Sequence, residues 1–141
     1  MKAVIRPAVE TDAAAVIEAG APVASTRAAQ RRLLAALRNG DVIVAVVGET
    51  IAGVVASNDG FFGHRFITLL AVPPAYRRRG LASRLLDAVL LQATTDRVFI
   101  STNESNAVIH ELCRRHGFVR AGVVDHLDPG DPEVFYVRHV R

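Results

Sequence analysis

The sequence has one cysteine and no tryptophan among its 141 residues. A single cysteine, Cys113, excludes an internal disulfide, so a reducing compartment is the expected setting. No apolar run reaches the roughly 18–20 residues that a membrane-spanning helix needs. The first sixteen residues contain Pro7, Glu10 and Asp12 where a secretory signal would be apolar. These absences predict a cytoplasmic protein without a membrane partner.

An excess of one charge sign is also missing. The 17 basic and 14 acidic residues leave a net charge of +3, and aromatic residues make up only 6% of the chain. A nucleic-acid partner is therefore not expected, because it would require a stronger basic bias and aromatic rings for stacking. Half of the residues are hydrophobic, which indicates a folded protein. The length predicts one domain over residues 1–141.

Turn residues divide the chain into short predicted elements. Apolar and β-branched runs predict strands over residues 2–6, 41–47, 50–57, 66–72, 97–101, 118–124 and 133–140. Helices are predicted from a Thr11 cap through Glu18, from a Ser25 or Thr26 cap to Asn39, and over residues 80–92 and 106–116. The last of these has an apolar stripe of Val108, Ile109, Leu112 and Cys113. The fold class is therefore α/β (α+β), with the order β-α-α-β-β-β-α-β-α-β-β around one sheet.

Three consecutive arginines and a glycine, Arg77 to Gly80, separate a predicted strand from the helix that follows. A helix N-terminus leaves backbone N–H groups without partners and carries a partial positive charge. Gly80 permits close approach of a ligand to the backbone, and guanidinium groups suit phosphate. The same pattern is also typical of a solvated basic turn. Neither a Walker loop nor a Gly-x-Gly-x-x-Gly fingerprint is present, which disfavours nucleoside triphosphates and dinucleotides.

The segment AVPPAYRRRGLASRLL resembles the acetyl-CoA-binding segment of the GNAT superfamily of N-acyltransferases. The family's Arg/Gln-x-x-Gly-x-Gly/Ala signature is filled by Arg77, Gly80 and Ala82. The usual Val-x-Pro-x-Tyr lead-in is also present, at Val72, Pro74 and Tyr76. A second segment, NAVIHELCRRHGF, resembles the following helix of the family, and the predicted element order matches the family along nearly the whole chain.

This resemblance implies an N-acetyltransferase that uses acetyl-CoA as cosubstrate and acetylates a primary amine of a small molecule or a peptide. The backbone of Leu70, Ala71 and Val72 would then contact the pantetheine arm. Asn106 matches an asparagine that contacts this arm or caps the helix. The pyrophosphate would lie on the turn and helix start formed by Arg77, Arg78, Arg79, Gly80, Leu81 and Ala82. No metal ligand is expected.

The sequence departs from the family pattern at its proton donor. The family commonly has a tyrosine four residues before the Gly-Phe pair, where this chain has Cys113. A thiol can protonate a thiolate, but Cys113 shares an apolar stripe, and a free cysteine is often simply a buried core residue. The proton could instead come from water or from Tyr76.

The general base is equally open. The central strand carries no carboxylate, and its one titratable candidate is His64, which shares a face with Phe66 and Thr68 by alternation. A solvent-facing histidine is the competing interpretation. Glu104, in the loop after residues 97–101, is the second candidate base, although it is also an ordinary first-turn carboxylate of the next helix.

The loop DHLDPGDPE has the residues of ordinary turns, and we hypothesise that its carboxylates attract a cationic amine. His110 is predicted on the solvent-exposed face of its helix, together with Glu111, Arg114 and Arg115. The final strands offer an edge through which a homodimer could form. The competing function is a non-catalytic acyl-CoA-binding module of the same fold, which the missing tyrosine and the missing strand carboxylate leave open.

Overall fold

The computed structural model describes residues 2–140, so Met1 and Arg141, the two ends of the predicted domain, lie outside the described residues. The elements follow the order β1 (Ala3–Pro7), α1 (Ala13–Gly20), α2 (Arg27–Arg38), β2 (Val42–Val47), β3 (Thr50–Phe61), β4 (His64–Ala71), α3 (Leu81–Gln92), β5 (Arg97–Asn103), α4 (Ala107–Arg115), β6 (Val119–Val124) and β7 (Glu133–His139). Short 3₁₀ helices precede α1 and α3, at Glu10–Asp12 and Pro74–Tyr76. This order confirms the predicted fold class.

The strands are hydrogen-bonded in the order β1-β2-β3-β4-β5-β7-β6. The β1–β2, β2–β3, β5–β7 and β6–β7 pairs are antiparallel, whereas β4 and β5 are parallel. The chain nevertheless divides into two compact units. Unit 1 is the chain up to Ser57 together with Thr68–Gln92, and unit 2 is Asn58–Ile67 together with the chain from Ala93 onward. None of the helices within residues 2–140 is long and apolar enough to cross a membrane.

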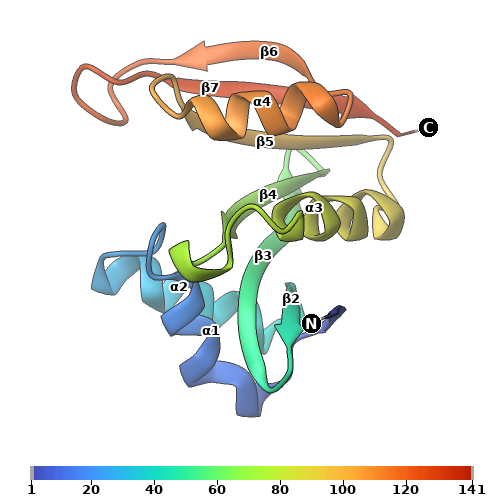
Figure 1. Ribbon diagram of the computed structural model, residues 1–141. Coiled ribbons are helices and arrows are strands. Elements are labelled where there is room, and N and C mark those ends of the chain that lie inside the picture. Colours follow the sequence, from blue (N-terminus) through green and yellow to red (C-terminus); the bar gives the residue numbers. More distant parts are fainter. Residues whose placement is uncertain (1, 141) are drawn as a thin grey trace. The chain divides into compact units, whose positions relative to one another are not determined.

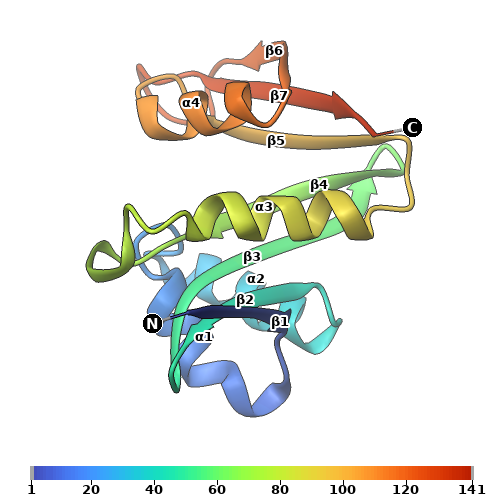
Figure 2. The same cartoon turned by 45° about the vertical axis from the view of Figure 1, so that its right-hand side comes forward.

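Unit 1 buries apolar side chains on both faces of its strands. Helices α1 and α2 contribute Val16, Leu33 and Leu37 to a core cluster with alternate residues of β2 and β3. The opposite face receives α3, which Figure 2 shows lying along the strands: a Cβ on Gly53 of β3 would come 2.9 Å from Leu85 of α3. Gly53 therefore permits close helix–strand packing, which fixes the start of α3 against the strands.

Unit 2 places α4 against one face of its strands (Figure 1). Strands β5 and β7 pair over seven residues, from Arg97 with His139 to Asn103 with Glu133. The side chains between this sheet and α4 are almost fully buried, among them Val98, Ile100, Val134, Leu112 and Cys113. Val108, which was expected in the apolar stripe of the helix, is 77% exposed. The stripe is therefore narrower than the sequence pattern predicts.

Two local predictions need correction. Thr11 does not cap α1: the carboxylate of Asp12 accepts a hydrogen bond from the Val9 amide at 2.8 Å and forms an ion pair with Arg6. Strand β3 continues four residues past Ser57 to Phe61. By contrast, Thr26 caps α2 as predicted, because its hydroxyl accepts a hydrogen bond from the amide of Ala29 at 3.0 Å.

Candidate active site

The arginine–glycine turn lies between the 3₁₀ helix and α3 in unit 1. Its backbone enters the left-handed region twice, with φ of 65° at Arg78 and 74° at Gly80. Two of the arginines are held locally: Arg77 Nε donates to the carbonyl of Val72 at 3.0 Å, and the Arg79 guanidinium lies 5.3 Å from the centre of the Tyr76 ring. All three arginine side chains are exposed. The turn is thus an ordered loop that displays positive charge.

The backbone amides of this turn form the feature most relevant to a ligand. Within residues 2–140, the N–H groups from Arg78 to Ala82 have no hydrogen-bond partner. Further into the helix the amide of Arg84 donates to the carbonyl of Gly80 at 3.1 Å. A Cβ on Gly80 would meet nothing within 4 Å, so open space adjoins these amides. Free amides, a helix N-terminus and guanidinium groups together form a geometry that binds anions.

The predicted cofactor strand is also in unit 1. Ala71 is buried in the core cluster, Leu70 and Val72 are half-buried, and Leu81 at the start of α3 is buried. Arg77 Nε already donates a hydrogen bond to the carbonyl oxygen of Val72, so this oxygen is less available to a ligand than the sequence predicted. Asn106 caps α4: its side chain accepts a hydrogen bond from the Ile109 amide at 3.3 Å. Contact of Asn106 with a cofactor arm stays a prediction.

Cys113 is fully buried in unit 2, beneath the helix that carries it. Burial raises the pKa of its thiol to about 12, since the thiolate would lose its hydration there. A thiol in this position is protonated but has no exposed surface from which to deliver the proton. The structure therefore favours the core interpretation of Cys113.

The two candidate bases do not come together. His64 begins β4 beside the start of β5, while Glu104 follows the other end of β5. Six residues of strand separate these ends by about 20 Å. The His64 ring lies 5.8 Å from the Phe99 ring, and its Nδ1 is buried without a hydrogen-bond partner in the described chain. Glu104 is exposed.

The pairing of His110 with Tyr136 was not predicted from the sequence. His110 was predicted on the wet face of α4, but it is half-buried, and its Nδ1 lies 2.5 Å from the Tyr136 hydroxyl on β7. Its Nε2 lies 3.1 Å from the carbonyls of both Asn103 and Glu104. Carbonyl oxygens only accept, so Nε2 carries the hydrogen and Nδ1 of the neutral ring accepts the tyrosine O–H. The partner lies 26 positions away, beyond the reach of any local pattern.

The acidic loop is attached to the same end of β5. Asn103 donates its amide to Asp128 at 2.8 Å and to the carbonyl of Asp131 at 3.1 Å. The carboxylate of Asp131 accepts from both the backbone amide and the hydroxyl of Ser105. These bonds hold the carboxylates beside Glu104 and the His110–Tyr136 pair. The C-terminal end of β5 therefore gathers groups able to move protons and to attract a cation.

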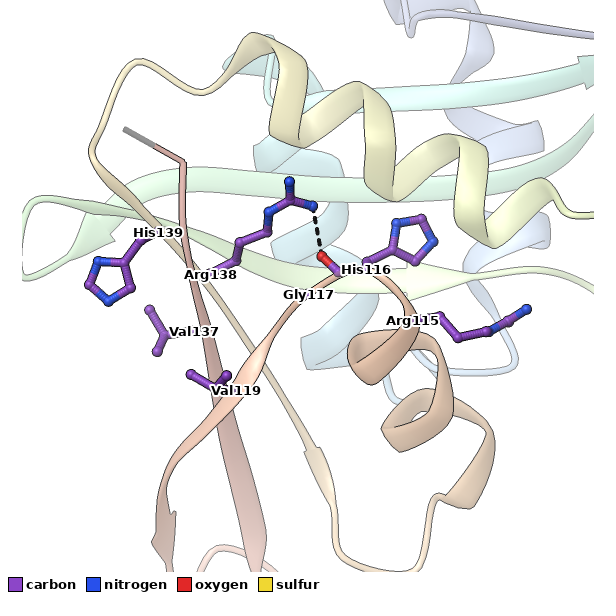
Figure 3. A pocket seen from close by; sticks show the side chains of 7 residues that line it. All are labelled: Arg115, His116, Gly117, Val119, Val137, Arg138 and His139. Atoms are coloured by element: carbon purple, nitrogen blue, oxygen red, sulfur yellow. Dashed lines mark hydrogen bonds between the residues drawn. The ribbon is translucent and has the colours of Figure 1, made fainter.

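A separate open hollow of about 600 Å³ lies at the opposite end of unit 2 (Figure 3). It is lined by Arg115, His116, Gly117, Val119, Val137, Arg138 and His139. Arg138 donates a 2.7 Å hydrogen bond to the carbonyl of His116, and the side chains of Arg115 and His139 point away from each other. Because the Arg115, Arg138 and His139 side chains diverge, they do not define a common anion site.

Comparison with known proteins identifies the family. Residues 12–118, about three quarters of the chain, match the model of the acetyltransferase (GNAT) family, and the chain belongs to this family. A comparison with curated proteins finds no match. The family assignment agrees with the resemblance seen at the arginine–glycine turn.

Solved structures of acetyltransferases share the fold. A GNAT-family acetyltransferase of Bacillus cereus is 29% identical, with a TM-score of 0.91 over 99% of this chain and 98% of that one. A putative acetyltransferase of Salmonella typhimurium, solved with its cofactor acetyl-CoA, is 20% identical, with a TM-score of 0.83 over 100% and 95%. The ribosomal-protein-S18-alanine N-acetyltransferase of Escherichia coli is 15% identical, with a TM-score of 0.81 over 99% and 94%.

Proposed function

We propose that this protein transfers the acetyl group of acetyl-CoA to a primary amine of a small molecule or a peptide. The observation that carries the proposal is the row of unpartnered amides from Arg78 to Ala82, flanked by arginines, in a chain of the GNAT family. The pyrophosphate of the cofactor would accept hydrogen bonds from these amides, and the guanidinium groups would add charge. The Salmonella structure, which contains acetyl-CoA, supports this cosubstrate.

The reaction would be a direct attack of the neutral amine on the thioester carbonyl. The nitrogen lone pair forms the N–C bond, the C–S bond breaks, and its electron pair leaves with the sulfur. The nitrogen then loses one proton and the thiolate gains one, which gives an amide and free CoA. A base and an acid at the reacting atoms therefore both lower the barrier.

The end of β5 holds the groups that best fit these two roles. Glu104, an exposed carboxylate beside the acidic loop, is the proposed base for the amine proton. Tyr136, held by His110, is the proposed acid for the leaving thiolate. His64 stays a weaker candidate because it lies at the other end of β5.

The acidic loop is the proposed attraction for the amine acceptor. Charge-neutral Asp125→Asn and Asp128→Asn substitutions should raise the acceptor KM, because a cationic amine would lose attraction there. The KM for acetyl-CoA should stay unchanged. An unaltered acceptor KM with a good amine substrate would remove the loop from the acceptor site.

The experiment that tests acetyl transfer is a screen of primary amines with acetyl-CoA, followed by free-thiol release and by mass spectrometry of the acetylated amine. The proposal predicts an amide product whose amount equals that of the released CoA. The alternative, a non-catalytic acyl-CoA-binding module, gains support from the burial of Cys113 at the family's tyrosine position. It predicts binding of acetyl-CoA without release of thiol with any amine.

A homodimer through the last strands is a further part of the proposal. Strand β6 ends the strand order, and each of its six residues is exposed, with Val119 60% and Val123 44% exposed. Such an edge offers unpaired backbone groups to a second copy. Light scattering should give twice the chain mass, and a Val119→Lys variant should give the mass of one chain. A monomer at high concentration would contradict the dimer.

A further inference from the structure

Five of the six phenylalanines in the sequence form one cluster in unit 2. Phe61 is at its centre, with ring centroids 5.1 Å from Phe66, 4.8 Å from Phe99 and 5.8 Å from Phe135. Phe66 and Phe135 are 6.0 Å apart, and Phe62 contacts Phe61 edge-on. These rings come from β3, β4, β5, β7 and the β3–β4 turn. We refer to Phe61, Phe66, Phe99 and Phe135 as the phenylalanine face.

The phenylalanine face lies on the side of the strands that α4 does not cover. Ile100 and Tyr136 are paired across β5 and β7, and Tyr136 points to α4, where it bonds to His110. Their sequence neighbours Phe99 and Phe135 must point to the other side, since side chains alternate along a strand. Phe66 is paired with Phe99 in the β4–β5 ladder and shares its side.

The exposure of this face differs from that of the α4 side. Val98, Ile100 and Val134, which face α4, are at most 3% exposed. All four rings of the phenylalanine face are only half-buried. Phe62, at the turn, is 88% exposed. Unit 2 therefore keeps aromatic surface accessible to a planar apolar group, while its aliphatic residues make the core.

Negative charge borders one end of the phenylalanine face. Glu133 lies two residues from Phe135 on the same side of β7, about 7 Å along the strand. Its half-buried carboxylate has no hydrogen-bond or ion-pair partner among the described residues. Glu133 is paired with Asn103, whose amide holds Asp128 at this end. The phenylalanine rings are complementary to an aromatic ring of a ligand, and the carboxylates at their end are complementary to a cationic group on the same ligand.

We propose that the amine acceptor carries an aromatic ring, which packs on the phenylalanine face with its ammonium group toward Glu133. This inference rests on the proposed acetyl transfer and names the acceptor class of that reaction. Offset or edge contacts between rings stabilise such a complex beyond the apolar area that it buries. The ammonium lies at the end of β5 where Glu104 is placed to take its proton.

The test compares two amines, phenethylamine and ethanolamine, in steady-state acetylation. The wild-type kcat/KM should be at least about tenfold higher for phenethylamine. Phe66→Leu and Phe99→Leu keep apolar volume but remove a ring, so they should raise the KM for phenethylamine by a larger factor than the KM for ethanolamine. Phe118→Leu is the matched control, because Phe118 is buried in the same unit outside the ring contacts of the described residues.

Calorimetric binding without acetyl-CoA separates this inference from the proposed reaction. Phenethylamine should bind the wild type, and it should bind both Phe66→Leu and Glu133→Gln more weakly than the wild type. The affinity for the uncharged phenethyl alcohol should be the same in Glu133→Gln as in the wild type. Binding with these dependences but without acetylation would sustain the aromatic site and reject the transferase. Acetylation without any preference for the ring, or no binding of phenethylamine, would overturn the inference and leave acetyl transfer standing.

Discussion

The hydroxyl of Tyr136 donates a hydrogen bond to Nδ1 of His110, which is oriented by two backbone carbonyls at the end of β5. This bond connects β7 to α4 and gives the phenol a partner that can exchange its proton. In the proposed reaction Tyr136 is the acid that protonates the leaving thiolate. The proposed acid therefore differs from Cys113, whose thiol is buried.

Replacing Tyr136 by phenylalanine should lower kcat by about 100-fold, the lower range for a positioned proton donor. The KM for acetyl-CoA should stay the same, and the alkaline limb of the pH profile of kcat should be lost. A His110→Gln variant should retain part of the activity with a shifted pH profile. If Tyr136→Phe only lowers the melting temperature and leaves kcat and its pH profile intact, the pair is structural.

Cys113 should be dispensable for catalysis. Cys113→Ala should keep kcat within about twofold and cost about 1 kcal/mol of stability, because a small buried volume is lost. An aromatic disulfide reagent should label the wild-type thiol only after unfolding. A loss of activity comparable with that of Tyr136→Phe would return Cys113 to the catalytic site.

The pKa of the Cys113 thiol also predicts a pH dependence of stability. The folded-state pKa of about 12 exceeds the unfolded value near 8.5, so only the unfolded chain ionises between them. The free energy of unfolding should therefore fall as pH rises above about 8.5. Urea denaturation at pH 7 and pH 10 should show a smaller difference for Cys113→Ala than for the wild type.

Asp12 should stabilise unit 1 in a pH-dependent way. The hydrogen bonds from Arg6 and from the Val9 amide lower the pKa of this carboxyl. Its contribution is therefore complete above the unfolded pKa of about 3.9 and is lost as pH falls through the lowered folded value. Asp12→Asn should cost about 1 kcal/mol at pH 7, with much of the ion-pair part screened because Arg6 is 38% exposed. Equal losses at pH 7 and pH 2.5 would contradict this assignment.

The turn between β3 and β4 should accept a stabilising substitution. Phe62 and Gly63 both have positive φ, 52° and 81°, a combination that strains phenylalanine and suits an Asn-Gly pair. Phe62→Asn should raise the free energy of unfolding by about 1 kcal/mol in urea denaturation. Gly63→Ala, which puts a side chain at the other left-handed position, should lower it. A destabilised Phe62→Asn would show that the exposed ring contributes more than its conformation costs.

The order of elements could be predicted because prolines, glycines and caps separate nearly every apolar run. The extension of β3 could not, because Asn58, Asp59 and Gly60 are typical turn residues. In the structure Asn58 accepts a hydrogen bond from the Gly60 amide, and Asp59 forms an ion pair with Arg65 on β4. Contacts within and across the hairpin thus keep turn residues in a strand.

The candidate site also has one part that could be predicted from the sequence and another that could not. The arginine–glycine turn could be predicted because its residues are contiguous and its chemistry is local. The His110–Tyr136 pair and the phenylalanine face could not, because they depend on the registers of β4, β5 and β7. Only those registers place Phe66 next to Phe99 and Tyr136 under His110.

The phosphate site at the arginine–glycine turn can be tested by thermal unfolding with and without acetyl-CoA, on the wild type, Gly80→Glu and Gly40→Glu. Both glycines have positive φ, 74° and 78°, with nothing within 4 Å of an added Cβ, so the backbone strain and the added charge are matched. Acetyl-CoA at 100 times its Kd should add about 2.7 kcal/mol to the free energy of unfolding. For a chain of this size this raises the melting temperature by roughly 5–10 °C. This shift is expected in the wild type and in Gly40→Glu but not in a folded Gly80→Glu. The same shift in Gly80→Glu, or none in the wild type, would contradict the phosphate site at the arginine–glycine turn.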